Sequence, residues 1–308
     1  MIRFGRRGIL SPGEMFPAGD AAYRVNFPRL RSGIKVRAVE RGNPTSPPVV
    51  LVHGWGCSAY VFRRNMPALA EAGFRAIAID LKGHGLSDKP VARAEYTIDS
   101  LVDHLRDILD ALELERPALV GHSLGGSLIY HFVCRYPERA QCLGLLAPVG
   151  LKGVPLMWLY RLLTPGFLAP MMRRINPRPL VRVALMRVYG KRGHFTDRDI
   201  DEYLAPAQFP EFHLAMRELL HSYDWNAAEH RHFSRLELPV AGVWGRLDHM
   251  MASDGMSIYE SLIPQIALYP VPDAGHVVAE ETPREVNEAL IALLQSCRPD
   301  PRILQIDD

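Results

Sequence analysis

Residues 119–128 read LVGHSLGGSL, in which a serine stands between two glycines directly after an apolar run. The pattern Gly121-x-Ser123-x-Gly125 predicts a sharp turn from a buried strand into a helix that begins near Leu124. Such a turn imposes an unfavourable backbone conformation on the serine and crowds the residues two positions before and after it, which must therefore be small. Open α/β sheets keep their sites at the C-terminal edge, so Ser123 is a candidate nucleophile there. An ordinary turn is the alternative.

Short apolar runs alternate with helix-length segments along most of the chain. Runs of this kind indicate strands buried on both faces of a parallel sheet. The predicted strands are 49–54, 74–80, 117–123, 142–148, 239–245 and 265–271. The segments 97–112 and 282–295 have helical spacing, each with a threonine as the expected N-cap. With an antiparallel hairpin around Gly33 ahead of them, these elements predict an α/β fold with an open, mostly parallel sheet flanked by helices.

One region interrupts this alternation. From about Leu151 to Arg235 no buried-strand run is found and prolines recur, which indicates a helical insertion between two strands. We therefore expect residues 1–150 and 236–308 to form the core domain, and residues 151–235 to form a helical cap inserted into it. Residues 297–308 are expected to be a loosely attached tail.

The composition places the chain among globular proteins. Hydrophobic residues make up 48% and charged residues 23% of the chain, which is enough to bury a full core. A formal net charge of +2 gives no reason to expect nucleic acid as a partner. The cysteines are scattered without a CxxC pair, which predicts free, buried thiols in a reducing compartment; they are Cys57, Cys134, Cys142 and Cys297. With no signal peptide or spanning helix expected, the chain is predicted to be soluble and cytoplasmic.

A serine hydroxyl becomes a useful nucleophile only beside a base that an acid orients. His276 follows the last predicted strand and Asp248 follows the strand before it, so both are expected on the edge that carries Ser123. The order Ser, Asp, His is the one expected for loops at that edge. Asp273 and Glu280 are alternative acids, although Asp273 is close to His276 in the chain. Capping or turn roles are the structural alternatives for the histidine and the aspartate.

The segment HGWG at 53–56 follows the strand 49–54 and is expected to face the nucleophile. Its two glycines allow a close backbone approach, so the amide of Trp55 could stabilise an oxyanion together with the amide of Leu124 at the helix N-terminus. The indole of Trp55 is expected to line the pocket, with a core aromatic as the alternative. His53 is expected to orient this loop.

Together these motifs resemble the α/β-hydrolase superfamily. The matching motifs are HGWG at 53–56, DLKGHGLSDKP at 80–90, GHSLGG at 121–126, GRLD at 245–248 and AGH at 274–276. The resemblance spans roughly residues 30–150 and 236–296, and it implies an eight-stranded sheet with the Ser123–Asp248–His276 triad. It also implies an oxyanion hole made by the Trp55 and Leu124 amides, and a cap at residues 151–235. Four further residues resemble a structural loop of the family and are assigned no chemistry: Asp80, Gly83, Gly85 and Ser87.

Departures from the family's subclasses narrow the expected activity. Dehalogenase and epoxide hydrolase members carry an aspartate where this chain has Ser123, which argues against both. C–C bond hydrolases often have an aromatic residue after the histidine, whereas Val277 follows here. The resemblance therefore implies a serine esterase or lipase-like member that cleaves carboxylic esters with apolar or amphiphilic acyl groups and needs no metal or organic cofactor. A C–C bond hydrolase or acyltransferase with the same triad, and a non-catalytic binding member, are the alternatives.

The expected cap is basic as well as apolar. Residues 151–196 hold nine lysines and arginines and no acidic residue. The apolar side is expected to face the triad and bind an acyl chain, with Trp158, Met171, Met172 and Val277 in the pocket. The basic side is either the solvated outside of the cap or a surface for an anionic membrane or a negatively charged substrate.

Overall fold

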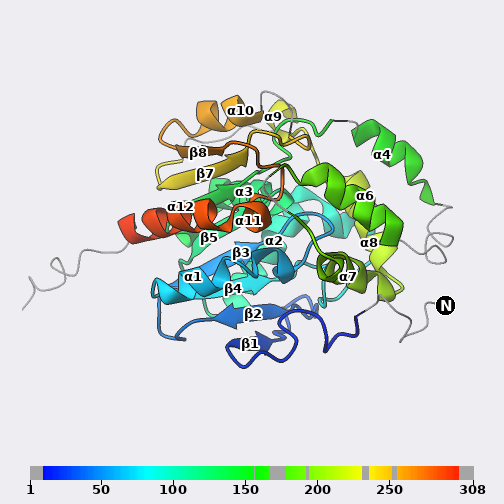
Figure 1. Ribbon diagram of the computed structural model, residues 1–308, viewed down its shortest axis with the longest axis horizontal. Coiled ribbons are helices and arrows are strands. Elements are labelled where there is room, and N and C mark those ends of the chain that lie inside the picture. Colours follow the sequence, from blue (N-terminus) through cyan, green and yellow to red (C-terminus); the bar gives the residue numbers. More distant parts are fainter. Residues whose placement is uncertain are drawn as a thin grey trace, which may run out of the picture.

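The strands form a single eight-stranded sheet in the computed structural model of the chain (Figure 1). The structure describes residues 10–155, 157–166, 178–191, 194–230, 236–251 and 255–297. The strand order is β1-β2-β4-β3-β5-β6-β7-β8. Only β2 is antiparallel to its neighbours, and all other neighbouring pairs are parallel. The strands are β1 (Tyr23–Asn26), β2 (Ala38–Arg41), β3 (Pro48–Val52), β4 (Arg75–Ile79), β5 (Ala118–His122), β6 (Leu143–Leu146), β7 (Val240–Gly245) and β8 (Ala267–Val271). The predicted open, mostly parallel sheet and its N-terminal hairpin are confirmed.

Helices cover both faces of the sheet (Figure 1). The core helices are α1 (Met66–Glu71), α2 (Ile98–Ala111), α3 (Leu124–Arg135), α10 (Gly255–Leu262), α11 (Val278–Glu281) and α12 (Pro283–Ser296). Helices α1 and α12 contact each other on one face, and α2 and α3 contact each other on the other. Three short 3-10 helices lie in the connections between strands and helices: η1 (Ala59–Phe62), η2 (Arg93–Tyr96) and η3 (Pro137–Arg139). The central strands β3, β4, β5, β6 and β7 are almost wholly buried between these layers, which accounts for their continuous apolar sequences.

The last strand departs from the expectation of burial on both faces. Of β8 only Val271 is buried, and Tyr269 is 41% exposed. The reason is topological, because β8 pairs only with β7 and ends the sheet.

The two threonines predicted as helix caps behave differently. The side chain of Thr97 accepts a hydrogen bond from the amide of Ser100, as an N-cap does. The side chain of Thr282 caps nothing and instead donates a 3.1 Å hydrogen bond to the carbonyl of Val278. Helix α11 ends immediately before α12, so the carbonyl of Val278 is the nearer partner. The capping role predicted for Thr282 is therefore wrong.

The segment between β6 and β7 contains the helices expected of a cap. These are α4 (Met157–Leu163), α6 (Arg178–Val188), α7 (Asp197–Leu204), η5 (Ala205–Gln208), α8 (Phe212–Ser222) and α9 (Ala227–His230). The described residues of this segment form no strand, and α4, α6, α7 and α8 lie together beyond one end of the sheet (Figure 1). We call residues 151–235 the cap; its boundaries stay predictions.

Two expectations from composition concern thiols and membrane spans. All four cysteines are free thiols, but only Cys142 is buried, so the expectation of burial is wrong for the other three. Among the described residues, no helix combines the length and the hydrophobicity that a membrane span requires.

Candidate active site

Ser123 lies at the junction of β5 and α3 in a strained backbone conformation. Its φ of 55° and ψ of −121° belong to a region that residues other than glycine rarely adopt. The flanking glycines permit this turn because nothing larger fits: a Cβ atom at Gly121 would lie 2.4 Å from the carbonyl oxygen of Gly125. The strain fits the arrangement predicted for a nucleophile held at the edge of the sheet.

The three residues of the expected triad come together at one edge of the sheet. The Nε2 atom of His276 lies 2.8 Å from the Oγ atom of Ser123. The Nδ1 atom of His276 lies 2.8 Å from the Oδ2 atom of Asp248. A carboxylate at Nδ1 fixes the proton on that nitrogen, which leaves Nε2 free to accept the serine proton. The chain therefore holds Ser123, His276 and Asp248 in one hydrogen-bonded line, the order expected of a nucleophile, its base and an orienting acid.

The environment of Asp248 favours its charged form. Its Oδ1 atom accepts hydrogen bonds from the amides of Met250 (2.7 Å) and Met251 (3.2 Å). Burial raises the pKa of this carboxyl, but the charge of His276, its hydrogen bond and the two amides outweigh burial and hold the pKa below its usual range. Asp248 is therefore ionised at neutral pH.

Among the described residues, the structure does not pair the alternative acids with His276. The carboxylate of Glu280 instead binds Arg63, Tyr189 and Tyr203. No hydrogen bond joins either side chain to His276 in the described part of the chain.

The HGWG loop packs directly against the nucleophile. A Cβ atom at Gly54 would lie 2.8 Å from the Cβ atom of Ser123. The next residue, Trp55, has an amide that donates no hydrogen bond within the described residues, and the same holds for Leu124. The indole of Trp55 donates a 3.1 Å hydrogen bond to the carbonyl of Met216 in α8, so the loop is tied to the cap. The use of the two amides as an oxyanion hole stays a prediction.

Two buried histidines near the triad are structural. His53 donates from Nδ1 to the carbonyl of Gly54 (2.7 Å) and accepts at Nε2 from the amide of Leu81 (3.1 Å), which orients the HGWG loop. His122 donates from Nε2 to the carbonyl of His276 (3.0 Å). Burial, followed by the nearby charge of His276, lowers the pKa of His122 to about 3. Burial also lowers the pKa of His53, so both rings are uncharged at neutral pH, and within the described part of the chain neither ring is hydrogen-bonded to the Ser123 hydroxyl.

A cavity of about 430 Å³ opens beside Ser123 and His276. Trp55 and Val277 line it, as predicted from the sequence. The cap supplies most of its wall through apolar side chains that were not predicted as pocket residues: Met157, Val181, Leu185, Phe212, Met216 and Leu220. The shape and composition suit an apolar group several carbons long.

Three cap residues were expected in this pocket. Trp158 is not part of the cavity wall, and the expectation is wrong because α4 turns Met157 and Tyr160 inward and leaves Trp158 67% exposed. Met171 and Met172 lie outside the described residues.

Some of the basic side chains of the cap form ion pairs or hydrogen bonds with other residues of the cap. Arg178 forms ion pairs with Asp197 and Asp201 of α7, and Arg161 donates to the backbone carbonyls of Leu220 and Tyr223. The predicted contact with an anionic membrane stays a prediction.

In the part of the chain that the structure describes, no three His, Cys, Asp or Glu side chains group so that they could hold a metal ion.

The model of one protein family, described as the alpha/beta hydrolase fold, matches residues 47–283. The chain belongs to this family. The match spans the HGWG loop, the nucleophile turn and the loops that carry Asp248 and His276, together with the intervening cap.

Relatives of this α/β hydrolase differ in their named activities. The dihydrolipoyllysine-residue acetyltransferase component of the acetoin cleaving system of Pseudomonas putida is 29% identical over 85% of this chain and 67% of its own length. Epoxide hydrolase A of Mycobacterium tuberculosis is 35% identical, over 38% of this chain and 36% of its own length. The carboxylesterase CesB of Bacillus subtilis superimposes with a TM-score of 0.73 and 21% identity, over 89% of this chain and 92% of that one. The family supports a hydrolase, and the relatives do not single out one substrate.

Proposed function

We propose that this α/β hydrolase cleaves carboxylic esters with apolar or amphiphilic acyl groups through an acyl-enzyme on Ser123. The observation that carries the proposal is the pair of 2.8 Å contacts that His276 makes with Ser123 and Asp248. The apolar cavity beside the serine supports an acyl chain as the group that is bound.

The reaction follows from these positions in two halves. As the Oγ atom of Ser123 attacks the ester carbonyl, Nε2 of His276 takes the serine proton and Asp248 stabilises the charged imidazole. The C–O bond to the alcohol then breaks, and His276 returns the proton to the leaving alcohol. In the second half water attacks the acyl-serine while His276 takes the water proton, the bond between the acyl carbon and Ser123 Oγ breaks, and His276 returns the proton to Oγ as the carboxylic acid leaves. The amides of Trp55 and Leu124 would stabilise the oxyanion in both halves.

Epoxide hydrolysis is a weaker candidate on chemical grounds. Attack of a serine oxygen on an epoxide carbon would form an ether, which water does not cleave under these conditions. Attack on an ester forms another ester, which water can cleave. A chain with Ser123 as the nucleophile therefore turns over esters but not epoxides.

Transfer of the acyl group to another acceptor is the second candidate. It is supported by the relative from Pseudomonas putida, whose name is that of an acetyltransferase component. Both outcomes share the acyl-enzyme and differ only in whether water or another nucleophile receives the acyl group. Adding an alcohol acceptor and measuring the ratio of acid to new ester separates them.

The test of the proposal is a substrate panel with a matched variant. p-Nitrophenyl esters from acetate to palmitate, lactones and an aryl epoxide are offered to the wild type and to Ser123→Ala. We expect ester turnover in the wild type, a loss of about 10⁶ in kcat in Ser123→Ala, and no epoxide opening. Ester turnover in Ser123→Ala within tenfold of the wild type would refute the proposal.

A further inference from the structure

Two consecutive glutamates, Glu280 and Glu281, end the short helix α11 that follows His276. Only 1% of Glu280 and 7% of Glu281 is exposed. Carboxylates are rarely buried to this degree unless they are paired, because burying a charge costs free energy. The proposed reaction uses neither of them, so their burial calls for another explanation. We call these two residues the glutamate pair.

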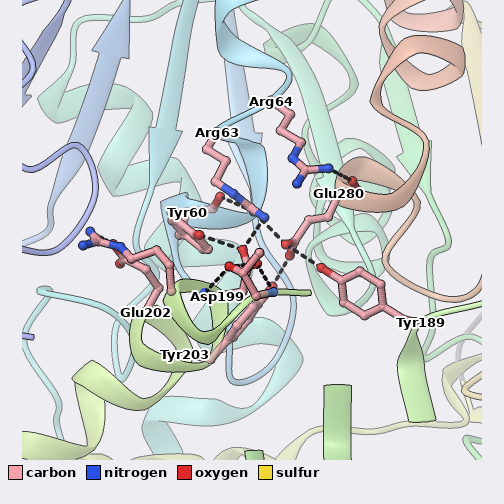
Figure 2. Close-up of polar contacts among 10 residues, drawn as sticks. Tyr60, Arg63, Arg64, Tyr189, Asp199, Glu202, Tyr203 and Glu280 are labelled. Carbon is pink, nitrogen blue, oxygen red and sulfur yellow. Dashed lines mark hydrogen bonds and ion pairs between the residues drawn. The ribbon is translucent and has the colours of Figure 1, made fainter. Parts of the chain in front are cut away.

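Glu280 joins the core to the cap (Figure 2). Its Oε2 atom lies 2.6 Å from Nη1 of Arg63, which follows η1 in the core. The same carboxylate accepts hydrogen bonds from the hydroxyl of Tyr189, which directly follows α6 (2.9 Å), and from the hydroxyl of Tyr203 in α7. Two cap tyrosines and one core arginine thus share one carboxylate.

Arg63 extends this junction to a second point of the cap. Its Nη2 atom lies 2.5 Å from Oδ1 of Asp199 in α7, which also accepts a 2.7 Å hydrogen bond from the hydroxyl of Tyr60 (Figure 2). The guanidinium therefore lies between a carboxylate of the core and a carboxylate of the cap. This arrangement holds α7 against η1 and α11.

Glu281 joins the cap to the loop that carries the catalytic histidine. Its Oε2 atom accepts hydrogen bonds from the amide of Gly190 in the cap (2.7 Å) and from the amide of Gly275, the residue before His276 (3.2 Å). Its Oε1 atom lies 3.0 Å from the same Gly275 amide. Among the described residues Glu281 has no cationic partner, so its oxygens serve as acceptors for backbone amides.

The two backbones that Glu281 joins are in direct contact. The amide of His276 donates a 2.7 Å hydrogen bond to the carbonyl of Val188, and the amide of Lys191 donates a 2.7 Å hydrogen bond to the carbonyl of Asp273. A Cβ atom at Gly190 would lie 2.5 Å from the carbonyl oxygen of Asp273. The C-terminal end of α6 therefore runs along the histidine loop with no space between them.

From these contacts we propose that Glu281 is a positioning residue, which holds the end of α6 against the histidine loop so that His276 Nε2 stays within hydrogen-bond distance of Ser123 Oγ. Glu280 supports the same junction through its hydrogen bonds with Tyr189 and Tyr203. Val188 also lines the cavity, and its carbonyl accepts the hydrogen bond from the amide of His276. The cavity wall beside the acyl chain is therefore hydrogen-bonded to the residue that acts as base in the proposed reaction. The catalytic part of this inference rests on the proposed function, whereas the junction itself does not.

An acceptor oxygen, rather than a negative charge, is what this role requires. Burial raises the pKa of Glu281 above its usual value, although the amides of Gly190 and Gly275 lower it in part. Because Oε2 already accepts from both amides, a glutamine that places its carbonyl oxygen there keeps an acceptor for both, once its amide nitrogen rotates away from the Gly275 amide that Oε1 faces in the wild type. A methionine of similar length cannot.

The experiment compares Glu281→Met with Glu281→Gln, with Glu288→Met on the exposed side of α12 as the matched control. We expect Glu281→Met to lower kcat for a p-nitrophenyl ester by about ten- to a hundredfold, the range that small misplacement of a catalytic group costs. KM should change less than threefold, and Glu281→Gln and Glu288→Met should keep kcat within threefold of the wild type. Equal losses in the Met and Gln variants of Glu281, or a loss confined to KM, would overturn the proposal.

Gly190→Ala as a second variant and hydrogen–deuterium exchange as a second measurement test the junction without relying on activity or on the folding of one variant. Gly190→Ala, made in the cap, should push the two backbones apart and reproduce the loss of kcat. Hydrogen–deuterium exchange of peptides that contain Gly275 and His276 should be faster in Gly190→Ala and Glu281→Met, but not in Glu281→Gln. Wild-type exchange rates in both variants would contradict the proposal. If the wild type turns over no ester, the proposed function fails, and the exchange rates still decide whether the junction exists.

Discussion

Gly125 packs so closely against Val52 that a Cβ atom at position 125 would lie 2.1 Å from the carbonyl oxygen of Val52. Neither the backbone of Val52 nor that of Gly125 can move away, because β3 lies in the middle of the sheet and α3 begins at the turn that carries Ser123. We expect Gly125→Ala to lower the free energy of unfolding by about 1–3 kcal/mol, measured by urea denaturation. Gly153→Ala is the control, since its Cβ atom would have no neighbour closer than 3.9 Å. Equal stability of the two variants would show that the close contact does not constrain the turn.

The charge of Asp248 makes part of the protein's stability depend on pH. Its pKa in the folded protein is held below the usual value, so folding favours the ionised form. That contribution is present above the unfolded pKa of about 4 and is lost as the pH falls through the folded pKa. We expect Asp248→Asn to be less stable than the wild type at neutral pH, and the difference to shrink as the pH falls below about 4. Thermal unfolding across this range checks the sign, and a difference that grows on acidification would contradict it.

The cap sets the length of the acyl group in the proposed reaction. Leu185 is buried in the cavity wall, whereas Val183 on the same helix is 61% exposed. Leu185→Trp should fill part of the cavity and lower kcat/KM for long-chain p-nitrophenyl esters by at least about tenfold, with little change for the acetate. Val183→Trp should leave both substrates unaffected. An equal effect of Leu185→Trp on acetate and on long-chain esters would argue against this cavity as the acyl site.

The predicted membrane contact can be tested on the outer face of α6. Leu180, Val183 and Met186 are each more than 60% exposed there. The same helix carries Arg182, which lies 3.5 Å from Asp197, and the exposed Arg187, which also borders the cavity. Apolar side chains flanked by arginines suit the surface of an anionic bilayer. We expect the protein to float with anionic vesicles at low salt, and to float less after all three apolar residues are changed to serine. Absence of binding to anionic vesicles at low salt would leave only a solvated outer face.

Positions that follow buried strands could be located from the sequence alone. Ser123 comes directly after β5, and Asp248 and His276 lie in the loops that follow β7 and β8. The C-terminal ends of parallel strands meet at one edge of the sheet. The proximity of these three residues in the fold could therefore be predicted, although they lie far apart in the sequence. The exposure of β8 could not be predicted in this way, because an apolar strand at an edge and one in the middle have similar sequences.

The inward face of a cap helix was harder to predict. Helix α4 reads MWLYRLL and is apolar on nearly every side, so its periodicity does not distinguish Met157 from Trp158. Only the packing of α4 against the rest of the cap decides which of the two faces the cavity.

The role of the glutamate pair also escaped prediction. Two adjacent acids within VVAEET are a visible signal, since they interrupt an apolar stretch directly after His276. Their partners Tyr189 and Gly190 precede them by 91 residues, and a local pattern gives no information about contacts across that distance.

Covalent labelling with a fluorophosphonate probe measures directly whether His276 activates the hydroxyl of Ser123. Peptide mass spectrometry should find a single adduct, on Ser123, in the wild type. Labelling of His276→Ala should be slower by at least about a hundredfold, because the general base is gone. An adduct on another residue, or wild-type labelling rates in His276→Ala, would contradict catalysis by the Ser123–His276–Asp248 triad.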